Sequence, residues 1–108
     1  MKIRAFGGGV LSVGLALLAL PAAAEDEVKG DIEYGEYLSA ECVACHQTQG
    51  HNQGIPQIAG MNASGMVAIL TAYKSKELNN ATMQTIAARL DDEQMAALAV
   101  YYASLPAE

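Results

Sequence analysis

Cys42-Val43-Ala44-Cys45-His46 is the stretch that decides the fold of this chain. The C-x-x-C-H spacing is the attachment signature of a c-type haem. Two thiols three residues apart lie about one helical turn from each other, so both can add to the vinyl groups of one porphyrin. His46 would then bind the iron through one ring nitrogen, while its other N–H needs an acceptor that fixes the ring.

Three other interpretations of these cysteines fit the sequence less well. A thioredoxin-like dithiol is expected in a βαβ context, and the chain lacks a β-branched run for a central strand. A zinc site would need Cys42, Cys45, His46 and His51 together, at a spacing unlike the usual ligand pairs. A disulfide between Cys42 and Cys45 would close a very small loop and gain little chain entropy. The sequence therefore favours one covalently bound haem c.

The N-terminus has the pattern of a secretory signal peptide. Lys2 and Arg4 form a short basic region, an apolar run follows over residues 10–20, and the alanines at 22–24 offer an A-x-A cleavage site. The apolar run is shorter than the ~20 residues of a membrane-spanning helix. We expect residues 1–24 to be removed and the mature protein, without a membrane span, to work in the periplasm.

Removal of this segment leaves a small acidic protein of 84 residues, in which four basic residues stand against twelve acidic ones, a net charge of −8. This charge argues against nucleic acid as a partner and favours a protein with a basic docking face. An apolar docking surface is the alternative. So short a chain buries a marginal core, so the haem would complete the interior. The alternative, an apolar docking surface for the partner, would consist of Ile55, Ile58, Met61 and Val67.

Apolar residues recur at helical spacing in several segments, separated by loops rich in Gly, Asn and Pro. Asp91 and Gln94 match a capping box at the start of the last helix, whose inner stripe would be Met95, Leu98, Ala99 and Tyr102. The chain therefore reads as one all-α domain. We expect a flexible acidic leader over 25–30, a domain over 31–106, and helices over 31–42, 62–76, a short segment ending near 90, and 91–105.

The chain resembles class I cytochrome c from about Gly30 to Leu105. The likeness is carried by the order of the C-x-x-C-H motif, the segment Gly54-Ile55-Pro56-Gln57-Ile58-Ala59-Gly60, Met83 in a polar loop before a short helix, and Leu98-Ala99-Val100-Tyr101-Tyr102. Within this class, Gly35-Glu36-Tyr37-Leu38 and Met83-Gln84-Thr85-Ile86-Ala87 are similar to the small cytochrome c subunit of flavocytochrome c sulfide dehydrogenase.

The resemblance implies roles for five residues of the site. Cys42 and Cys45 would carry the thioether bonds, and His46 would be the proximal axial ligand of the iron. The carbonyl of Pro56 would accept the imidazole N–H, and Met83 would be the distal axial ligand.

The resemblance also implies that the N- and C-terminal helices cross, with Gly35 against Tyr101 or Tyr102. A glycine permits close backbone approach, and an aromatic ring fills the remaining gap.

One departure from the family pattern concerns the haem propionates. Relatives often have an arginine or another basic group just before the ligand methionine, whereas this chain has none directly there. The contact would fall to Lys74, Lys76, Asn79 or Asn80.

A His/Met iron has no open position for a substrate, and thioether ligation raises its potential. We therefore expect an electron-transfer protein and not an enzyme, acting as the electron-accepting subunit or partner of a flavin-dependent sulfide dehydrogenase. A freely diffusing periplasmic carrier is one alternative, and a haem enzyme or gas-binding module with an open distal site is another. Met61, Met66 or His51 could replace Met83 as the ligand, whereas Met95 fits the core.

Overall fold

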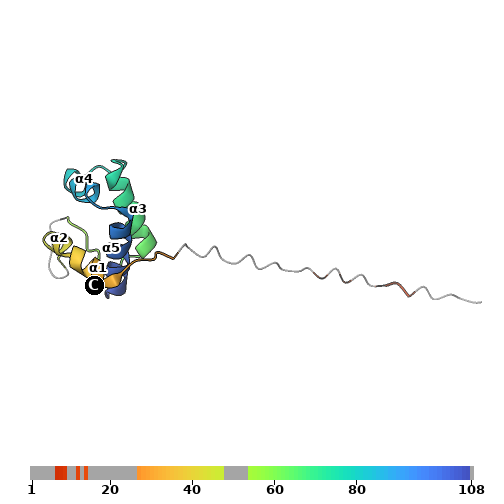
Figure 1. The fold of residues 1–108 in the computed structure, drawn as a ribbon. Helices are drawn as coiled ribbons and strands as arrows, with labels where there is room; N and C mark the ends of the chain where they lie inside the picture. The colour runs from red at the N-terminus through yellow and green to blue at the C-terminus, as the bar shows by residue number, and fades with distance from the viewer. Residues whose placement is uncertain (1–6, 10–11, 13, 15–26, 48–53, 108) are drawn as a thin grey trace, which may run out of the picture.

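The computed structural model describes residues 7–9, 12, 14, 27–47 and 54–107. The described part forms five helices and no strand, which confirms the predicted all-α fold (Figure 1). Most of the expected signal peptide lies outside the described residues, and so does His51. No described helix has the length and apolar character that crossing a membrane requires. The helices are α1 (Ile32–Leu38), α2 (Ala40–Val43), α3 (Ala63–Lys74), α4 (Ala81–Ala88) and α5 (Asp92–Ser104).

The first expected helix is divided in two at Ser39. Asp31 caps α1, because its Oδ1 accepts hydrogen bonds from the backbone N–H groups of Glu33 at 2.9 Å and Tyr34 at 3.2 Å. The hydroxyl of the buried Ser39 donates to the carbonyl of Glu36 at 2.6 Å. A serine that bonds back to the preceding turn competes with the helical ladder, so α2 begins as a separate short helix and carries Cys42.

The terminal helices cross at Gly35, as the resemblance implies. A Cβ atom at Gly35 would overlap the backbone carbonyl of Ala97 and would lie 2.7 Å from the Cβ of Tyr101. The missing side chain therefore allows the backbones of α1 and α5 to touch. Tyr101 in turn packs edge-on against Tyr102, with ring centroids 5.2 Å apart.

The start of α5 is a capping box, as predicted. Asp91 Oδ1 accepts from the backbone N–H of Gln94 at 2.8 Å, and Gln94 Oε1 accepts from the backbone N–H of Asp91 at 2.9 Å. The expected inner stripe of this helix is buried, with Met95 1% and Tyr102 1% exposed. These two hydrogen bonds satisfy two backbone N–H groups that have no partner within the helix, which stabilises the start of α5.

The start of α4 differs from the expectation. Helix α4 begins at Ala81, so Met83 lies inside its first turn and not in a loop before it. The cause is Asn80, whose side-chain oxygen accepts from the backbone N–H of Met83 at 3.0 Å. An asparagine in a polar run can belong to a loop or cap a helix; here it caps the helix.

Part of the segment expected to be a flexible leader packs against the helical domain. Val28 lies against the hydrophobic core, and a Cβ atom at Gly30 would approach the carbonyl carbon of Ala96 to 2.6 Å. Residues 28–30 therefore run along α5. A valine and a glycine suffice for this contact, although the segment has no helical periodicity.

Candidate functional site

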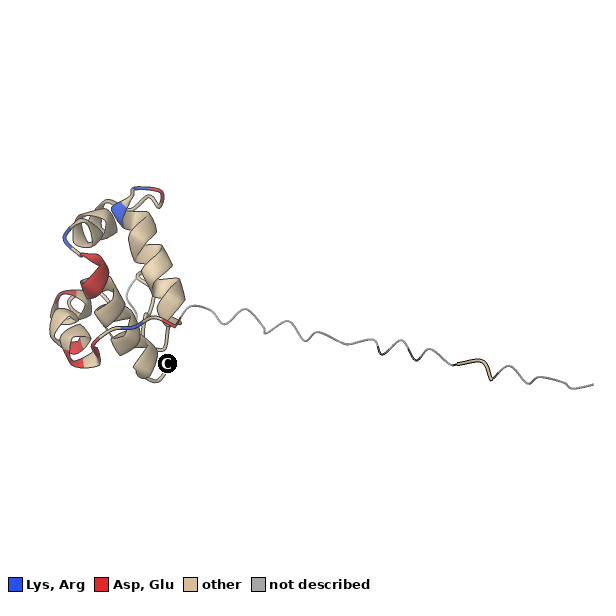
Figure 2. Cartoon of the chain, turned by 45° about the vertical axis from the view of Figure 1, so that its right-hand side comes forward, with Lys and Arg blue, Asp and Glu red and all other residues tan. Residues whose placement is uncertain are grey.

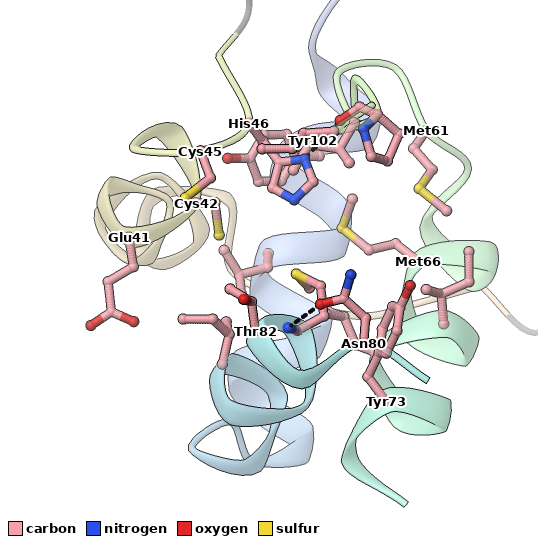
Figure 3. Close-up of a pocket in the computed structure, with 18 of the residues that line it drawn as sticks. Glu41, Cys42, Cys45, His46, Met61, Met66, Tyr73, Asn80, Thr82 and Tyr102 are labelled. Atoms are coloured by element: carbon pink, nitrogen blue, oxygen red, sulfur yellow. Dashed lines mark hydrogen bonds between the residues drawn. The ribbon is translucent and has the colours of Figure 1, made fainter. Parts of the chain in front are cut away.

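A cavity of about 630 Å³ opens between the helices and the 54–61 segment. Its volume falls within the ~300–1,000 Å³ of typical cofactor pockets. Figure 3 shows Cys42, Cys45 and His46 on one part of the wall, with the start of α4 facing them. All five site residues predicted from the sequence line it, and so do Ile69, Leu70, Ile86, Leu90 and Leu98.

The turn after α2 brings the two cysteines and the histidine to this cavity. The backbone N–H groups of Cys45 and His46 both donate to the carbonyl of Cys42, at 3.1 and 2.7 Å. Both thiols are free; Cys42 is partly buried and Cys45 is exposed. One tight turn therefore presents two sulfurs and an imidazole to the same cavity.

The state of Cys42 bears on the dithiol alternative. Burial raises the pKa of the Cys42 thiol, and the neighbouring carboxylate of Glu41 raises it further. A catalytic C-x-x-C dithiol needs the opposite, a thiol whose pKa is lowered. This environment suits a cysteine that is held covalently, and it does not suit a redox nucleophile.

His46 has a defined orientation and a defined tautomer. Its Nδ1 lies 2.7 Å from the carbonyl oxygen of Pro56. A carbonyl can only accept, so Nδ1 carries a hydrogen, and in the neutral ring Nε2 keeps its lone pair. The ring projects into the cavity with Nε2 available as a ligand atom (Figure 3). A metal-binding histidine usually donates its other ring N–H to an acceptor of this kind, which fixes the orientation of the ring.

Of the four methionines in the described part of the chain, three line the cavity. Met83 is half-buried on α4, Met61 is half-buried in the segment before α3, and Met66 is buried in α3 with 5% exposure. Met95 is buried in the core, where its sulfur accepts from the hydroxyl of Thr71 at 3.8 Å. The structure thus leaves three sulfur candidates for a ligand opposite His46, with Met83 on a capped helix end.

The lysines considered for the propionates lie elsewhere. The ammonium group of Lys74 donates to the carbonyl of Leu90, which ties the end of α3 to the turn before α5. Neither Lys74 nor Lys76 lines the cavity, and Asn79 does not line it either. Of the four residues named from the sequence, only Asn80 reaches the cavity wall.

Two tyrosines of the cavity were not identified as site residues from the sequence. Tyr73 and Tyr102 both line it, although their helical spacing indicates only a packed stripe. The Tyr102 hydroxyl is buried beside the Cys42 thiol and the Ser39 hydroxyl, but it makes no well-formed hydrogen bond within the described part of the chain. Burial also raises the pKa of Tyr102, so the group stays neutral. A buried hydroxyl without a well-formed hydrogen bond is costly, and this suits a cavity that a bound group completes.

The donor set fits haem c and does not fit a bare metal ion. Among the described residues, no three or more His, Cys, Asp or Glu side chains are grouped so that they could hold a metal. Two thiols and one free imidazole nitrogen around a large apolar cavity instead match a porphyrin that is attached covalently and ligated from the protein.

Comparisons with known proteins agree with this chemistry. The family described as Cytochrome c matches residues 32–106. Cytochrome c-554(548) of Halomonas halodenitrificans is 38% identical over 82 residues, which cover 69% of this chain and 96% of that protein. A thiosulfate dehydrogenase electron acceptor of Stutzerimonas stutzeri is 33% identical over 99 residues, and one of Thiomonas intermedia is 34% identical over 70. These matches cover 88% and 62% of this chain, but only 46% and 32% of those two proteins.

Proposed function

We propose that this chain, which belongs to the cytochrome c family, accepts electrons from an exported dehydrogenase that oxidises a reduced inorganic sulfur compound. Family membership makes it an electron-transfer protein with covalently bound haem c. The observation that carries the finer proposal is the 33% identity, over 88% of this chain, to a protein named a thiosulfate dehydrogenase electron acceptor. The resemblance to the small subunit of flavocytochrome c sulfide dehydrogenase supports the same substrate class, with a flavoprotein as partner.

The residues of the cavity have separate tasks in this proposal. Bound haem c supplies a one-electron iron couple. Cys42 and Cys45 would hold it by two thioethers, and His46, oriented by the Pro56 carbonyl, would bind the iron on one side. Met83 would take the opposite axial position, where a thioether favours the ferrous state and raises the potential.

This arrangement leaves the chain without a substrate site of its own. If His46 and Met83 occupy both axial positions, no position remains for an inorganic sulfur compound. The cavity walls are mostly apolar and exclude water from the haem, and among the described lining residues Glu41 is the only carboxylate. The oxidation of the sulfur compound would therefore belong to the partner.

Acidic side chains of this chain form the surface that would bind the partner. Seven of the acidic residues gather on α1, α2 and the start of α5, which we call the acidic surface (Figure 2). One member, Glu41, also lines the cavity, so this surface reaches the cofactor. The members are Asp31, Glu33, Glu36, Glu41, Asp91, Asp92 and Glu93.

We expect electron transfer from the dehydrogenase to slow steeply as ionic strength rises. Salt screens the attraction between the acidic surface and a basic partner beyond a Debye length of about 8–10 Å. Stopped-flow reduction at increasing salt concentration measures the effect, and Glu33→Gln with Glu36→Gln should lower the rate at low salt. Glu77→Gln, in the loop between α3 and α4 and outside the acidic surface, is the control and should change little. A rate that ignores salt would favour the apolar docking alternative.

Co-purification from the native host tests the partnership itself. From cells grown on thiosulfate or sulfide, we expect the tagged chain to bring down a dehydrogenase at one-to-one stoichiometry, and bound flavin would identify the sulfide-type partner. A lone red monomer that the isolated dehydrogenase still reduces would indicate a diffusing periplasmic carrier. The proposal fails if neither thiosulfate nor sulfide reduces this cytochrome in a periplasmic extract. Mass analysis of the same sample tests removal of residues 1–24.

A further inference from the structure

We infer that Tyr73 and Asn80 bind the carboxylate side chains of haem c through neutral hydrogen bonds, in the role that a basic residue fills in relatives. The inference rests on the bound haem c and is independent of which protein donates electrons. Of the polar residues at and after the end of α3, these two would face the cofactor.

The cysteines set the direction of the cofactor in the cavity. In haem, the two vinyl groups that form thioethers lie on one half of the macrocycle, and the two propionates lie on the other half. Figure 3 shows Cys42 and Cys45 on one side of the cavity and Tyr73 and Asn80 on the opposite side. The propionates would therefore project toward the wall that Tyr73 and Asn80 form.

Both residues offer donors that are otherwise unused. The Asn80 oxygen accepts from the backbone N–H of Met83 at 3.0 Å, which fixes the amide and leaves its NH₂ group toward the cavity (Figure 3). Within the described part of the chain, neither this NH₂ group nor the Tyr73 hydroxyl has a hydrogen-bond partner. An amide NH₂ group and a phenol hydroxyl can both donate a hydrogen bond to an acceptor such as a carboxylate.

The charges around the cavity agree with this direction. Glu41 is the only carboxylate among the described lining residues, and it lies on the cysteine side (Figure 3), where it pairs with Arg89 at 3.6 Å. No lysine or arginine of the described residues lines the cavity, and Lys74 is engaged with the carbonyl of Leu90. The propionates would thus avoid the one carboxylate and meet neutral donors.

Holoprotein variants that remove one donor at a time test the inference. Tyr73→Phe removes only the hydroxyl, and Asn80→Ser removes the amide donor while serine still caps α4. In each variant we expect the propionate bending mode in the resonance Raman spectrum to shift. At fixed ambient potential, the ratio of oxidised to reduced protein should rise about twofold to tenfold, as for one lost hydrogen bond. The less compensated carboxylate stabilises the ferric state.

Matched controls separate this contact from a general effect on the fold. Tyr37→Phe changes a tyrosine that is 77% exposed, and Asn79→Ser changes the neighbouring asparagine outside the cavity; neither should move the Raman mode. Thermal unfolding of each holoprotein tests whether α4 is intact. An unshifted mode in both Tyr73→Phe and Asn80→Ser would overturn the inference. A shift in Lys74→Gln or Lys76→Gln alone would assign the propionates to lysine instead.

Discussion

Replacing Met83 by alanine is expected to turn a closed haem site into one that binds carbon monoxide. The ferrous wild-type protein should resist carbon monoxide, because under the proposal His46 and Met83 would hold both axial positions. The ferrous variant should bind it readily, and the ferric variant should lose the sulfur-to-iron charge-transfer band. Absorption spectroscopy measures both changes.

The same substitution should lower the midpoint potential by an amount on the order of 0.1–0.2 V, within the ~0.8 V range that axial ligands control. A thioether stabilises the ferrous state, and the water or vacancy that replaces it does not. The backbone of α4 should persist, because the cap from Asn80 is made to the backbone N–H of residue 83 and not to its side chain. The loss of potential can therefore be assigned to the sulfur.

Two other methionines provide the controls. Met61→Ala removes a half-buried thioether that also lines the cavity, and Met66→Leu conserves the volume of a buried one. Both variants should keep the charge-transfer band. If the charge-transfer band survives in Met83→Ala and is lost in Met61→Ala or Met66→Leu, the distal ligand is the methionine whose substitution removes the band. A wild-type protein that already binds carbon monoxide would instead support the haem enzyme or gas-binding alternative.

The parts of the fold that could be predicted from the sequence depend on residues close together in the chain. The capping box of Asp91 and Gln94 joins residues three positions apart, and the turn of Cys42 and Cys45 is equally local. A helical stripe such as Leu98 and Tyr102 needs only a regular period. In each case the local chemistry alone is enough to select the structure.

The features that could not be predicted from the sequence depend on contacts that a periodic pattern does not identify. Lys74 looks like a solvated helix end or a propionate partner, but the packing of α3 brings it to the carbonyl of Leu90, sixteen residues away. Tyr73 has the spacing of a core residue, and it reaches the cavity only because α3 lies beside α4. Asn80 fits both a loop and a cap, so one hydrogen bond to Met83 decides where α4 begins.

Without haem, the chain is expected to lose its cooperative fold. Most of the larger buried side chains, including Leu70, Leu98 and Tyr102, are at the same time walls of the cavity. Without haem, the apolar walls of this cavity face water instead of a porphyrin, which costs about 25 cal/mol per Å² of apolar surface left exposed. A typical domain has only ~5–15 kcal/mol of total stability. The double variant Cys42→Ala with Cys45→Ala, purified free of haem, should therefore show low helicity by circular dichroism and no cooperative thermal transition.

Adding haem to this double variant is the control for the substitutions themselves. His46 and Met83 can still approach the iron without the thioethers, so helicity and a cooperative transition should return in part. A haem-free variant that melts cooperatively, with the near-ultraviolet dichroism of the holoprotein, would contradict the expectation. It would mean that α4 closes onto α5 to form a complete apolar core, so that the chain alone and not the cofactor determines the positions of these helices.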